Sequence, residues 1–332
     1  MSRPSSDDLD FQSDCIERVL AAHRVPGQVH GGTVTPRWVR YHFAPAPGVR
    51  LAAVRHLTEE LALALGAPGV RVARDGDHLA LEVPRAEAEP VTLRSLRRAV
   101  PNAPPFTAYL GLAEDGRPLL IRLASPEVAH VLIAGATGSG KTELLRTILC
   151  SLALTHRPDQ LQFLLLDPKG RGLGPLASAG HCLAPVVTQA ADMAAWLERL
   201  VALMERRDRE SQAAPRLVIA VDELAEALTL AGRRAEAALT RLAQRGREAG
   251  LHVVAATQRP AAAALAPMLK ANFPARLVGR VASAEDARVA SGRAGTGAER
   301  LLGRGDFLAV AAGQVTRFQA ACVTPGDYPS AV

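Results

Sequence analysis

The fold is decided by the stretch Gly135-Ala136-Thr137-Gly138-Ser139-Gly140-Lys141-Thr142. These eight residues fit the pattern G-x-x-x-x-G-K-[ST], and they stand between an apolar run, HVLIAGA, and a helix-like run, ELLRTILCSLAL. A strand, a glycine-rich loop and a helix in that order are what a phosphate-binding loop requires. The glycines let the backbone fold around phosphate oxygens, and the helix N-terminus adds its dipole. We therefore interpret residues 135–142 as a binding site for ATP.

Two side chains of this loop carry the chemistry. We expect the ammonium of Lys141 to neutralise the β- and γ-phosphates and the hydroxyl of Thr142 to bind Mg²⁺. Lys141 is also one of only three lysines among 39 Lys and Arg residues, the others being Lys169 and Lys270. Because lysine is a compact point charge and arginine a planar fork, a lysine in such an arginine-rich chain favours a place where only a single ammonium fits, with chance as the alternative for Lys270.

Polar residues end two further apolar runs. The run Leu217–Val221 ends in Asp222-Glu223, which is typical of a Walker B element. We expect Asp222 to hold the water shell of Mg²⁺ and Glu223 to polarise the attacking water. The run HVVAAT ends in Gln258, where an amide can sense the γ-phosphate or orient the water. A solvated acidic helix start and an ordinary loop amide are the alternative interpretations.

The apolar runs around these residues alternate with long helical stretches. Their nearly continuous Val, Leu and Ile content is typical of strands buried on both faces of a parallel sheet. Three later runs, RLVGRVAS, DFLAVAA and TRFQAACV, are expected to extend that sheet or to cap its edge. Asp167-Pro168-Lys169 ends another strand, so its charges should emerge at the same edge as the phosphate loop, with a structural salt bridge as the alternative. We predict an α/β fold with a parallel-rich central sheet over residues 106–332.

The first third of the chain has a different pattern. Residues 25–105 contain short alternating runs, a helix-like run LTEELALALG, and an Asp-Gly turn between VRVAR and HLALEV. These features predict a small α+β domain, followed from residue 84 by a linker that carries a short helix, LRSLRRAV. Residues 1–24 are predicted to be an N-terminal extension, in which the amphipathic stretch Phe11–Leu20 forms a docking helix.

Composition sets broad limits. Hydrophobic residues make up 48% of the 332 residues, enough for a sizeable core. No run approaches the roughly 18 apolar residues of a membrane span, and the start lacks a signal peptide, so we expect a cytoplasmic protein without direct membrane insertion. The four scattered cysteines indicate neither a zinc site nor a disulfide framework. The net charge of +6 favours an anionic partner such as nucleic acid, although arginine-rich composition can also reflect genome bias.

At this point the chain resembles the motor of the FtsK/SpoIIIE DNA translocases. The resemblance rests on HVLIAGATGSGKTELL, FLLLDPK, LVIAVDELAEAL, LTRLAQRGREAGLHVVAATQRP and LKANFPARLVGRVASAEDAR, in the family's order and spacing. It implies a RecA-like P-loop ATPase domain at residues 106–332, the family's β subdomain, preceded at 25–105 by its α subdomain. The expected activity is ATP hydrolysis coupled to translocation of double-stranded DNA.

The resemblance also implies a homo-oligomer, usually a hexameric ring, in which ATP lies between subunits and a neighbour's arginine completes the site. That arginine matches Arg247, and a trans-acting guanidinium would stabilise charge on the transferring phosphate. An exposed arginine at a helix C-terminus is the alternative. The family's DNA-contacting loops match Arg259 and the stretch Ser283–Arg288. Ala284 stands where relatives often carry lysine, which leaves Arg288 as the basic contact and predicts a weaker grip, unless both arginines are plain surface charge.

We expect motor subdomains alone, with neither a membrane region nor a C-terminal winged-helix γ domain. A role in plasmid, mobile-element or phage DNA transfer or segregation is therefore expected, or recruitment by a separate membrane protein. One alternative function is a protein-export ATPase like those of type VII secretion. Another is an ATP-regulated DNA-binding scaffold.

Overall fold

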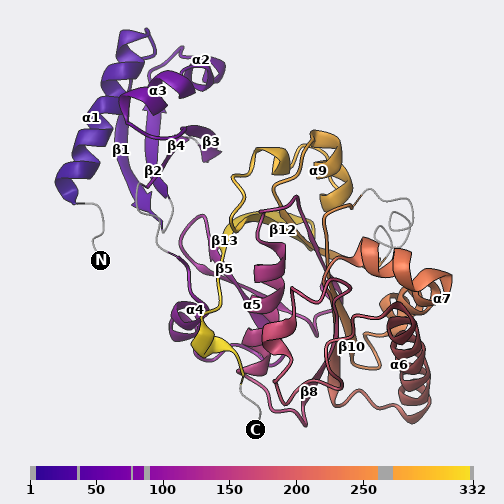
Figure 1. Ribbon diagram of the computed structural model, residues 1–332. Coiled ribbons are helices and arrows are strands. Elements are labelled where there is room, and N and C mark those ends of the chain that lie inside the picture. Colours follow the sequence, from indigo (N-terminus) through magenta and orange to yellow (C-terminus); the bar gives the residue numbers. More distant parts are fainter. Residues whose placement is uncertain (1–4, 36–37, 76–77, 86–89, 261–271, 330–332) are drawn as a thin grey trace. The chain divides into compact units, whose positions relative to one another are not determined.

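The computed structural model describes residues 5–35, 38–75, 78–85, 90–260 and 272–329. The chain divides into two compact units, Met1–Pro90 and Val91–Val332, both drawn in Figure 1. Lys270 and residues 76–77 of the expected Asp-Gly turn lie outside the described residues. Within the described ranges, none of the helices combines the length and the apolar character that a membrane span requires.

The first unit is a four-stranded antiparallel sheet with three helices. The sheet order is β1-β2-β4-β3, and the elements are α1 (Ser6–Ala22), β1 (Gly27–Val34), β2 (Trp38–Pro45), α2 (Leu51–His56), α3 (Thr58–Ala64), β3 (Arg71–Asp75) and β4 (His78–Pro84). Alternate residues of β2 and β4, such as Tyr41 and Leu81, point to one face and pack there against Ile16 of α1 and Leu61 of α3. Burial alternates along β2, as expected for an antiparallel sheet with one covered face. In β4, by contrast, all residues from Leu79 to Val83 are buried, including Glu82, which pairs with Arg40 and Arg71.

Two details of this unit go beyond what the sequence indicates. Helix α1 is longer than the predicted stretch Phe11–Leu20, because Ser5 and Asp8 form a capping box at its start. Its Ile16 and Leu20 are fully buried, so this helix contributes to the core of the unit. Strand β1 was not predicted at all, since GQVHGGTV has three glycines and no alternation, and it carries a register shift between Val29 and Gly32.

The second unit is built on a nine-stranded sheet of order β6-β5-β13-β12-β11-β7-β10-β9-β8. The strands are β5 (Thr107–Ala113), β6 (Pro118–Arg122), β7 (Val131–Ala134), β8 (Leu161–Leu166), β9 (Arg216–Val221), β10 (Leu251–Thr257), β11 (Ala275–Gly279), β12 (Asp306–Ala311) and β13 (Gln314–Ala320). The five strands from β11 to β8 are parallel, and the other pairs are antiparallel. The predicted α/β fold with a parallel-rich sheet is confirmed, and the three later runs extend that sheet.

Helices cover both faces of this sheet (Figure 1). They are α4 (Leu93–Ala99), α5 (Lys141–Ala153), α6 (Ala190–Glu210), α7 (Leu224–Arg245) and α9 (Ala284–Ser291). In β7, Val131 and Ile133 pack into the core that contains α4 and α5, whereas Leu132 packs into the core that contains α6 and α7. Each strand residue is therefore buried whichever way it points, which explains the continuous apolar runs. Helix α4, expected within the linker, packs in this unit through Leu93 and Leu96.

Two buried histidines join the amino ends of β7 and β10. His130 accepts a hydrogen bond at Nδ1 from the backbone N–H of Val253 at 2.9 Å. His252 Nδ1 lies 2.8 Å from the carbonyl oxygen of Ala129. Burial lowers the pKa of His130 to about 3, and the neighbouring His252 and Arg247 add to this effect. Burial lowers the pKa of His252 to about 4, against the opposing effect of its hydrogen bond to Ala129. Both rings are therefore neutral in the folded protein at physiological pH.

This pair makes stability depend on pH. Between about pH 6.5 and pH 4 the unfolded chain binds a proton on each histidine and the folded chain does not, so the free energy of unfolding falls as the pH falls. At about 1.4 kcal/mol per pH unit, we expect a loss of about 2 kcal/mol per histidine between about pH 7.5 and pH 5. Urea denaturation at the two pH values measures it. His130→Asn keeps an amide oxygen that can accept the same hydrogen bond but cannot bind the proton. Its free energy of unfolding should therefore fall by about 2 kcal/mol less than that of the parent between the two pH values. Equal losses in parent and variant would contradict this.

Candidate nucleotide-binding site

Residues 135–142 link the carboxyl end of β7 to the start of α5. Gly138 and Gly140 have φ values of 78° and 100°, in the left-handed region that favours glycine. Gly140 is the N-cap of α5 and supplies no side-chain cap, so the N–H groups of the first helical turn have no intrahelical acceptor. This end of α5 presents N–H donors and the positive end of the helix dipole to an anion.

Two distant segments hold this loop. The backbone N–H groups of Arg304 and Gly305 donate to the carbonyl oxygens of Gly138 and Ser139 at 3.0 and 2.8 Å, and Ala136 N–H donates to a carbonyl just after β11 at 2.6 Å. A Cβ on Gly140 would lie 3.1 Å from the nitrogen of Gly305. The sequence did not indicate this support, although Gly303 and Gly305 flanking Arg304 just before β12 were a signal of unusual backbone.

The interior of the loop fits a triphosphate. The hydroxyl of Ser139 is buried without a hydrogen-bond partner among the described residues. Lys141 is 6% exposed, and its ammonium donates to the carbonyl of Ala136 at 3.0 Å. Burial lowers the pKa of Lys141, against the opposing effect of Glu223. The Ser139 side chain lies against Gly135 and against Gly279 at the end of β11. A buried ammonium is costly without an anionic ligand, and phosphate oxygens would satisfy that of Lys141.

Thr142 and Asp222 meet beside the loop. The Thr142 hydroxyl lies 3.1 and 3.3 Å from the two carboxylate oxygens of Asp222, at the carboxyl end of β9. Burial raises the pKa of Asp222, and the nearby carboxylates of Asp167 and Glu223 raise it further, while the Thr142 hydrogen bond lowers it. A hydroxyl and a carboxylate are hard oxygen ligands, and a divalent cation would relieve this concentration of negative charge. These residues therefore fit Mg²⁺.

Glu223 is held in an unusual conformation. It is the N-cap of α7 with φ 65° and ψ 71°, a left-handed region that non-glycine residues rarely adopt. Its carboxylate is buried and accepts hydrogen bonds from the N–H of Gln258, at 3.1 and 3.2 Å, and from the hydroxyl of Thr257 at 3.2 Å. The role of Thr257 was missed in the sequence, where its place just before Gln258 was the only signal.

Gln258 closes the cluster from the end of β10. The hydroxyl of Thr137, in the phosphate loop, donates to its side-chain oxygen at 3.0 Å. The backbone N–H of the next residue, the exposed Arg259, donates to the Thr257 hydroxyl at 3.2 Å. The structure thus brings the predicted residues of the loop, Asp222-Glu223 and Gln258 together at one edge of the sheet.

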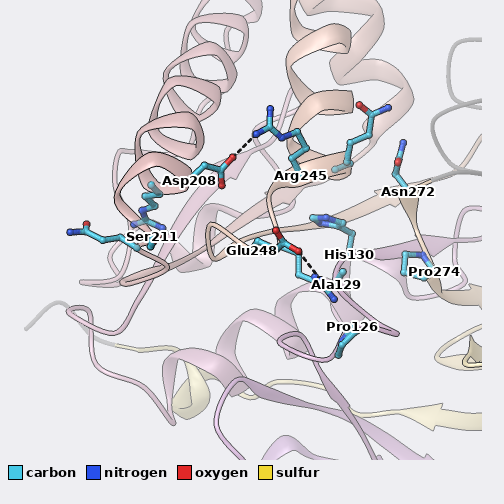
Figure 2. Close-up of a pocket in the computed structure, with 14 residues that line it drawn as sticks. Pro126, Ala129, His130, Asp208, Ser211, Arg245, Glu248, Asn272 and Pro274 are labelled. Carbon is cyan, nitrogen blue, oxygen red and sulfur yellow. Dashed lines mark hydrogen bonds and ion pairs between the residues drawn. The ribbon is translucent and has the colours of Figure 1, made fainter.

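Arg247 lies at the amino ends of the parallel strands, opposite to the carboxyl ends that carry the cluster. It follows α7, which ends at Arg245, and lines a cavity of about 810 Å³ at the amino ends of the parallel strands. Figure 2 shows this cavity, with Asp208 from the end of α6 facing Arg245, at 2.8 Å. Arg247 itself is paired with Glu248 at 3.2 Å, and their side chains are 38% and 80% exposed. Such an exposed pair contributes little free energy, so the guanidinium is available to another anion.

The length of β10 separates Arg247 from the phosphate loop of the same chain. Seven residues lie in this strand, and at about 3.3 Å per residue they span roughly 23 Å. Arg247 precedes the strand and Gln258 follows it. An arginine side chain cannot cover that distance, so the structure does not bring Arg247 to the Lys141 cluster.

The predicted DNA contacts differ from each other. Arg259 is exposed beside the cluster. Arg288 lies on α9 and is paired with Glu285 at 2.5 Å, on a helix whose first turn also carries Asp286. With Ala284 at the first helical position, α9 carries two acidic residues and one basic residue. This balance is unfavourable for holding phosphate.

Two family models match the chain. The FtsK/SpoIIIE family model matches residues 96–211 and 206–262, and the FtsK alpha domain model matches residues 2–85. Together they include the phosphate loop, Asp222-Glu223, Arg247 and Gln258. They also include most of the first unit.

Curated relatives agree with these models. The DNA translocase FtsK of Sporosarcina ureae is 35% identical over 92% of this chain and 43% of that protein. The DNA translocase SftA of Bacillus subtilis (strain 168) is 34% identical over 94% of this chain and 35% of that protein. The chain therefore spans less than half the length of these relatives.

Solved structures share the fold. The pCW3 conjugation coupling protein TcpA, in its monomer form with ATPγS, superposes with a TM-score of 0.65 at 19% identity, over 96% of this chain and 97% of that chain. The cytoplasmic domain of the type VII secretion ATPase EccC of Thermomonospora curvata gives 0.59 at 29% identity, over 70% of this chain and 32% of that chain.

Proposed function

Because the chain belongs to the FtsK/SpoIIIE family, we propose that it is an ATPase motor that translocates double-stranded DNA. The observation that carries this proposal is the cluster of Lys141, Thr142, Asp222, Glu223 and Gln258 at one edge of the sheet. These residues come from the ends of two strands, β9 and β10, and from the start of α5. Their arrangement supports binding and hydrolysis of a nucleoside triphosphate.

Each residue has a role in hydrolysis. The first-turn N–H groups of α5 and the Lys141 ammonium bind the phosphates. Glu223 accepts a proton from the attacking water, and its two hydrogen bonds from the end of β10 fix where its carboxylate points. Thr142 and Asp222 would hold Mg²⁺, which would neutralise charge on the phosphate oxygens.

We further propose that the site is completed between subunits of a homo-oligomeric ring, the hexamer of the family. Support comes from the placement of Arg247 at the sheet edge opposite to its own phosphate loop. In a head-to-tail ring the amino edge of one subunit faces the carboxyl edge of the next, so each Arg247 meets a neighbour's γ-phosphate. Leaving Glu248 for that phosphate costs little, since the pair is exposed.

DNA contact would be coupled to the nucleotide through β10. Gln258 touches the phosphate loop through Thr137, and Arg259 is the next residue. A shift of Gln258 on hydrolysis would therefore move the Arg259 guanidinium directly. Arg288, paired with Glu285, is the weaker of the two proposed contacts.

The proposal extends to the cellular location and the biological process. A motor that uses ATP and duplex DNA would act in the cytoplasm, where both are found. We propose that a separate membrane or recruiting protein is its partner. Transfer or segregation of plasmid, mobile-element or phage DNA is the process we propose for it. A relaxase, integrase or replication initiator gene beside this one would support that process, and its absence from all related loci would count against it.

Linear duplex DNA tests the motor itself. We expect DNA to raise ATP turnover severalfold and the protein to displace a third strand from a triplex placed along the duplex. Lys141→Ala, which removes the phosphate-binding ammonium, is the negative control. The proposal fails if DNA leaves turnover unchanged and Lys141→Ala matches the parent in strand displacement.

A second function has one observation in its favour. The EccC cytoplasmic domain is 29% identical over 70% of this chain, so an export ATPase that acts on a polypeptide remains the competing proposal. Turnover stimulated by a peptide instead of by DNA would select it. An ATP-regulated DNA-binding scaffold would instead show salt-sensitive DNA binding without displacement of the third strand.

A further inference from the structure

The segment 167–173, which follows β8, is organised around one buried carboxylate. Asp167 is 1% exposed. Its Oδ1 accepts the N–H groups of Lys169 and Gly170 at 3.1 and 3.0 Å, and its Oδ2 accepts those of Gly172 and Leu173 at 2.7 and 3.0 Å. Both oxygens are committed to the backbone of the segment. Asp167 therefore shapes the segment and is not placed to bind a ligand itself.

Within this segment, Gly172 lies directly against the carboxylate of Asp222. A Cβ on Gly172 would lie 1.9 Å from Oδ2 of Asp222, 2.8 Å from its Cγ, and 3.2 Å from the Cγ2 of Thr142. Contacts this short are impossible for a real side chain, so any residue larger than glycine must displace the Asp222 carboxylate or the segment. Gly172 thus sets the space available to the Thr142–Asp222 pair.

Two side chains tie the segment to the elements that carry the cluster. Arg146 lies one turn after Thr142 on α5 and donates to the carbonyl oxygens of Gly172 and Arg171 at 2.5 and 3.2 Å. Lys169 pairs at 2.8 Å with Glu226, in the first turn of α7. The segment therefore bridges the helix that bears Thr142 and the helix that begins after Glu223.

We propose that residues 167–173 are a positioning element that fixes the Asp222 carboxylate against the Thr142 hydroxyl and thereby sets the affinity of the nucleotide site for its divalent cation. Gly172 is its size-determining residue, Asp167 its organiser, and Arg146 its anchor on α5. This inference rests on the proposed function only in taking the site to bind a nucleotide with Mg²⁺. It requires neither DNA nor hydrolysis.

Gly172→Ala tests the inference, and Gly174→Ala is the matched control. The control adds the same methyl group two residues along, where no atom lies within 4 Å. A fluorescent ATP analogue is titrated onto the full chain, first in EDTA and then at rising Mg²⁺ concentration. In EDTA, we expect Gly172→Ala to bind the analogue with the affinity of the parent. The Mg²⁺ concentration that gives half of the metal-dependent increase in affinity should be about tenfold or more higher than for the parent. Gly174→Ala should match the parent in both titrations.

Arg146→Ala gives an independent variant that adds no bulk. It removes two donors to the segment, and we expect a shift in Mg²⁺ dependence in the same direction, by about threefold to tenfold. The inference is overturned if both variants keep the parent's Mg²⁺ dependence, if Gly172→Ala loses binding equally with and without Mg²⁺, or if the parent binds the analogue independently of Mg²⁺. Failure of DNA to stimulate turnover would instead overturn the proposed function and leave these titrations unchanged.

Discussion

Glu223→Gln is expected to reduce ATP turnover by about 100-fold or more while leaving nucleotide affinity within about twofold of the parent. The amide keeps the size of the carboxylate but cannot take a proton from water. It also keeps one oxygen to accept the N–H of Gln258 or the hydroxyl of Thr257. Phosphate release under saturating ATP measures turnover, and titration of a fluorescent ATP analogue measures affinity.

Glu236→Gln is the control, because it makes the same change further along α7, away from the cluster. It should behave as the parent in both assays. If Glu223→Gln kept turnover within a fewfold of the parent, Glu223 would not be the base. If it lost nucleotide binding, its role would be in holding the loop.

Arg247→Ala is expected to lower turnover by about 10³-fold with unchanged nucleotide binding, in the range of trans-acting arginines in phosphoryl transfer. The reason is its position, since it lies at the sheet edge opposite to its own phosphate loop. The decisive measurement is the ATP turnover of a mixture of two inactive variants. Arg247→Ala and Lys141→Ala should each be inactive alone, and mixed rings should regain activity wherever an intact loop faces an intact arginine.

Arg234→Ala, which removes an exposed arginine paired with Glu198 on the neighbouring helix, is the control and should leave turnover unchanged. Normal turnover of Arg247→Ala would show that this arginine does not complete the site. A large loss of turnover without recovery on mixing would show that it acts within its own subunit, contrary to the geometry described above.

The sequence predicts those parts of the site that are local. Residues 135–142 form a contiguous motif, and Asp222 and Gln258 each end an apolar run, so strand topology alone brings them to one edge. The same reasoning explains why the α/β fold was predicted, since strands buried on both faces have to be apolar throughout. Periodicity did not indicate β1, because its glycines obscure any alternation.

The parts that the sequence did not predict depend on contacts across long chain separations. Gly172 is an ordinary loop glycine until Asp222 is seen 1.9 Å from its missing Cβ. Thr257 looks like any buried strand residue until its hydroxyl is seen on Glu223. Arg247 could be matched by resemblance, but only the strand order shows that it cannot reach its own loop. No local pattern encodes such distances.

The support that Arg304 and Gly305 give to the phosphate loop has a consequence for biosynthesis. On the ribosome the loop emerges long before these two residues, whose N–H groups hold the carbonyls of Gly138 and Ser139. Arg304 and Gly305 directly precede strand β12, which pairs with β11. A nascent chain that carries the loop but not β12 lacks this brace, so we expect it to bind nucleotide more weakly than a chain in which β12 is present.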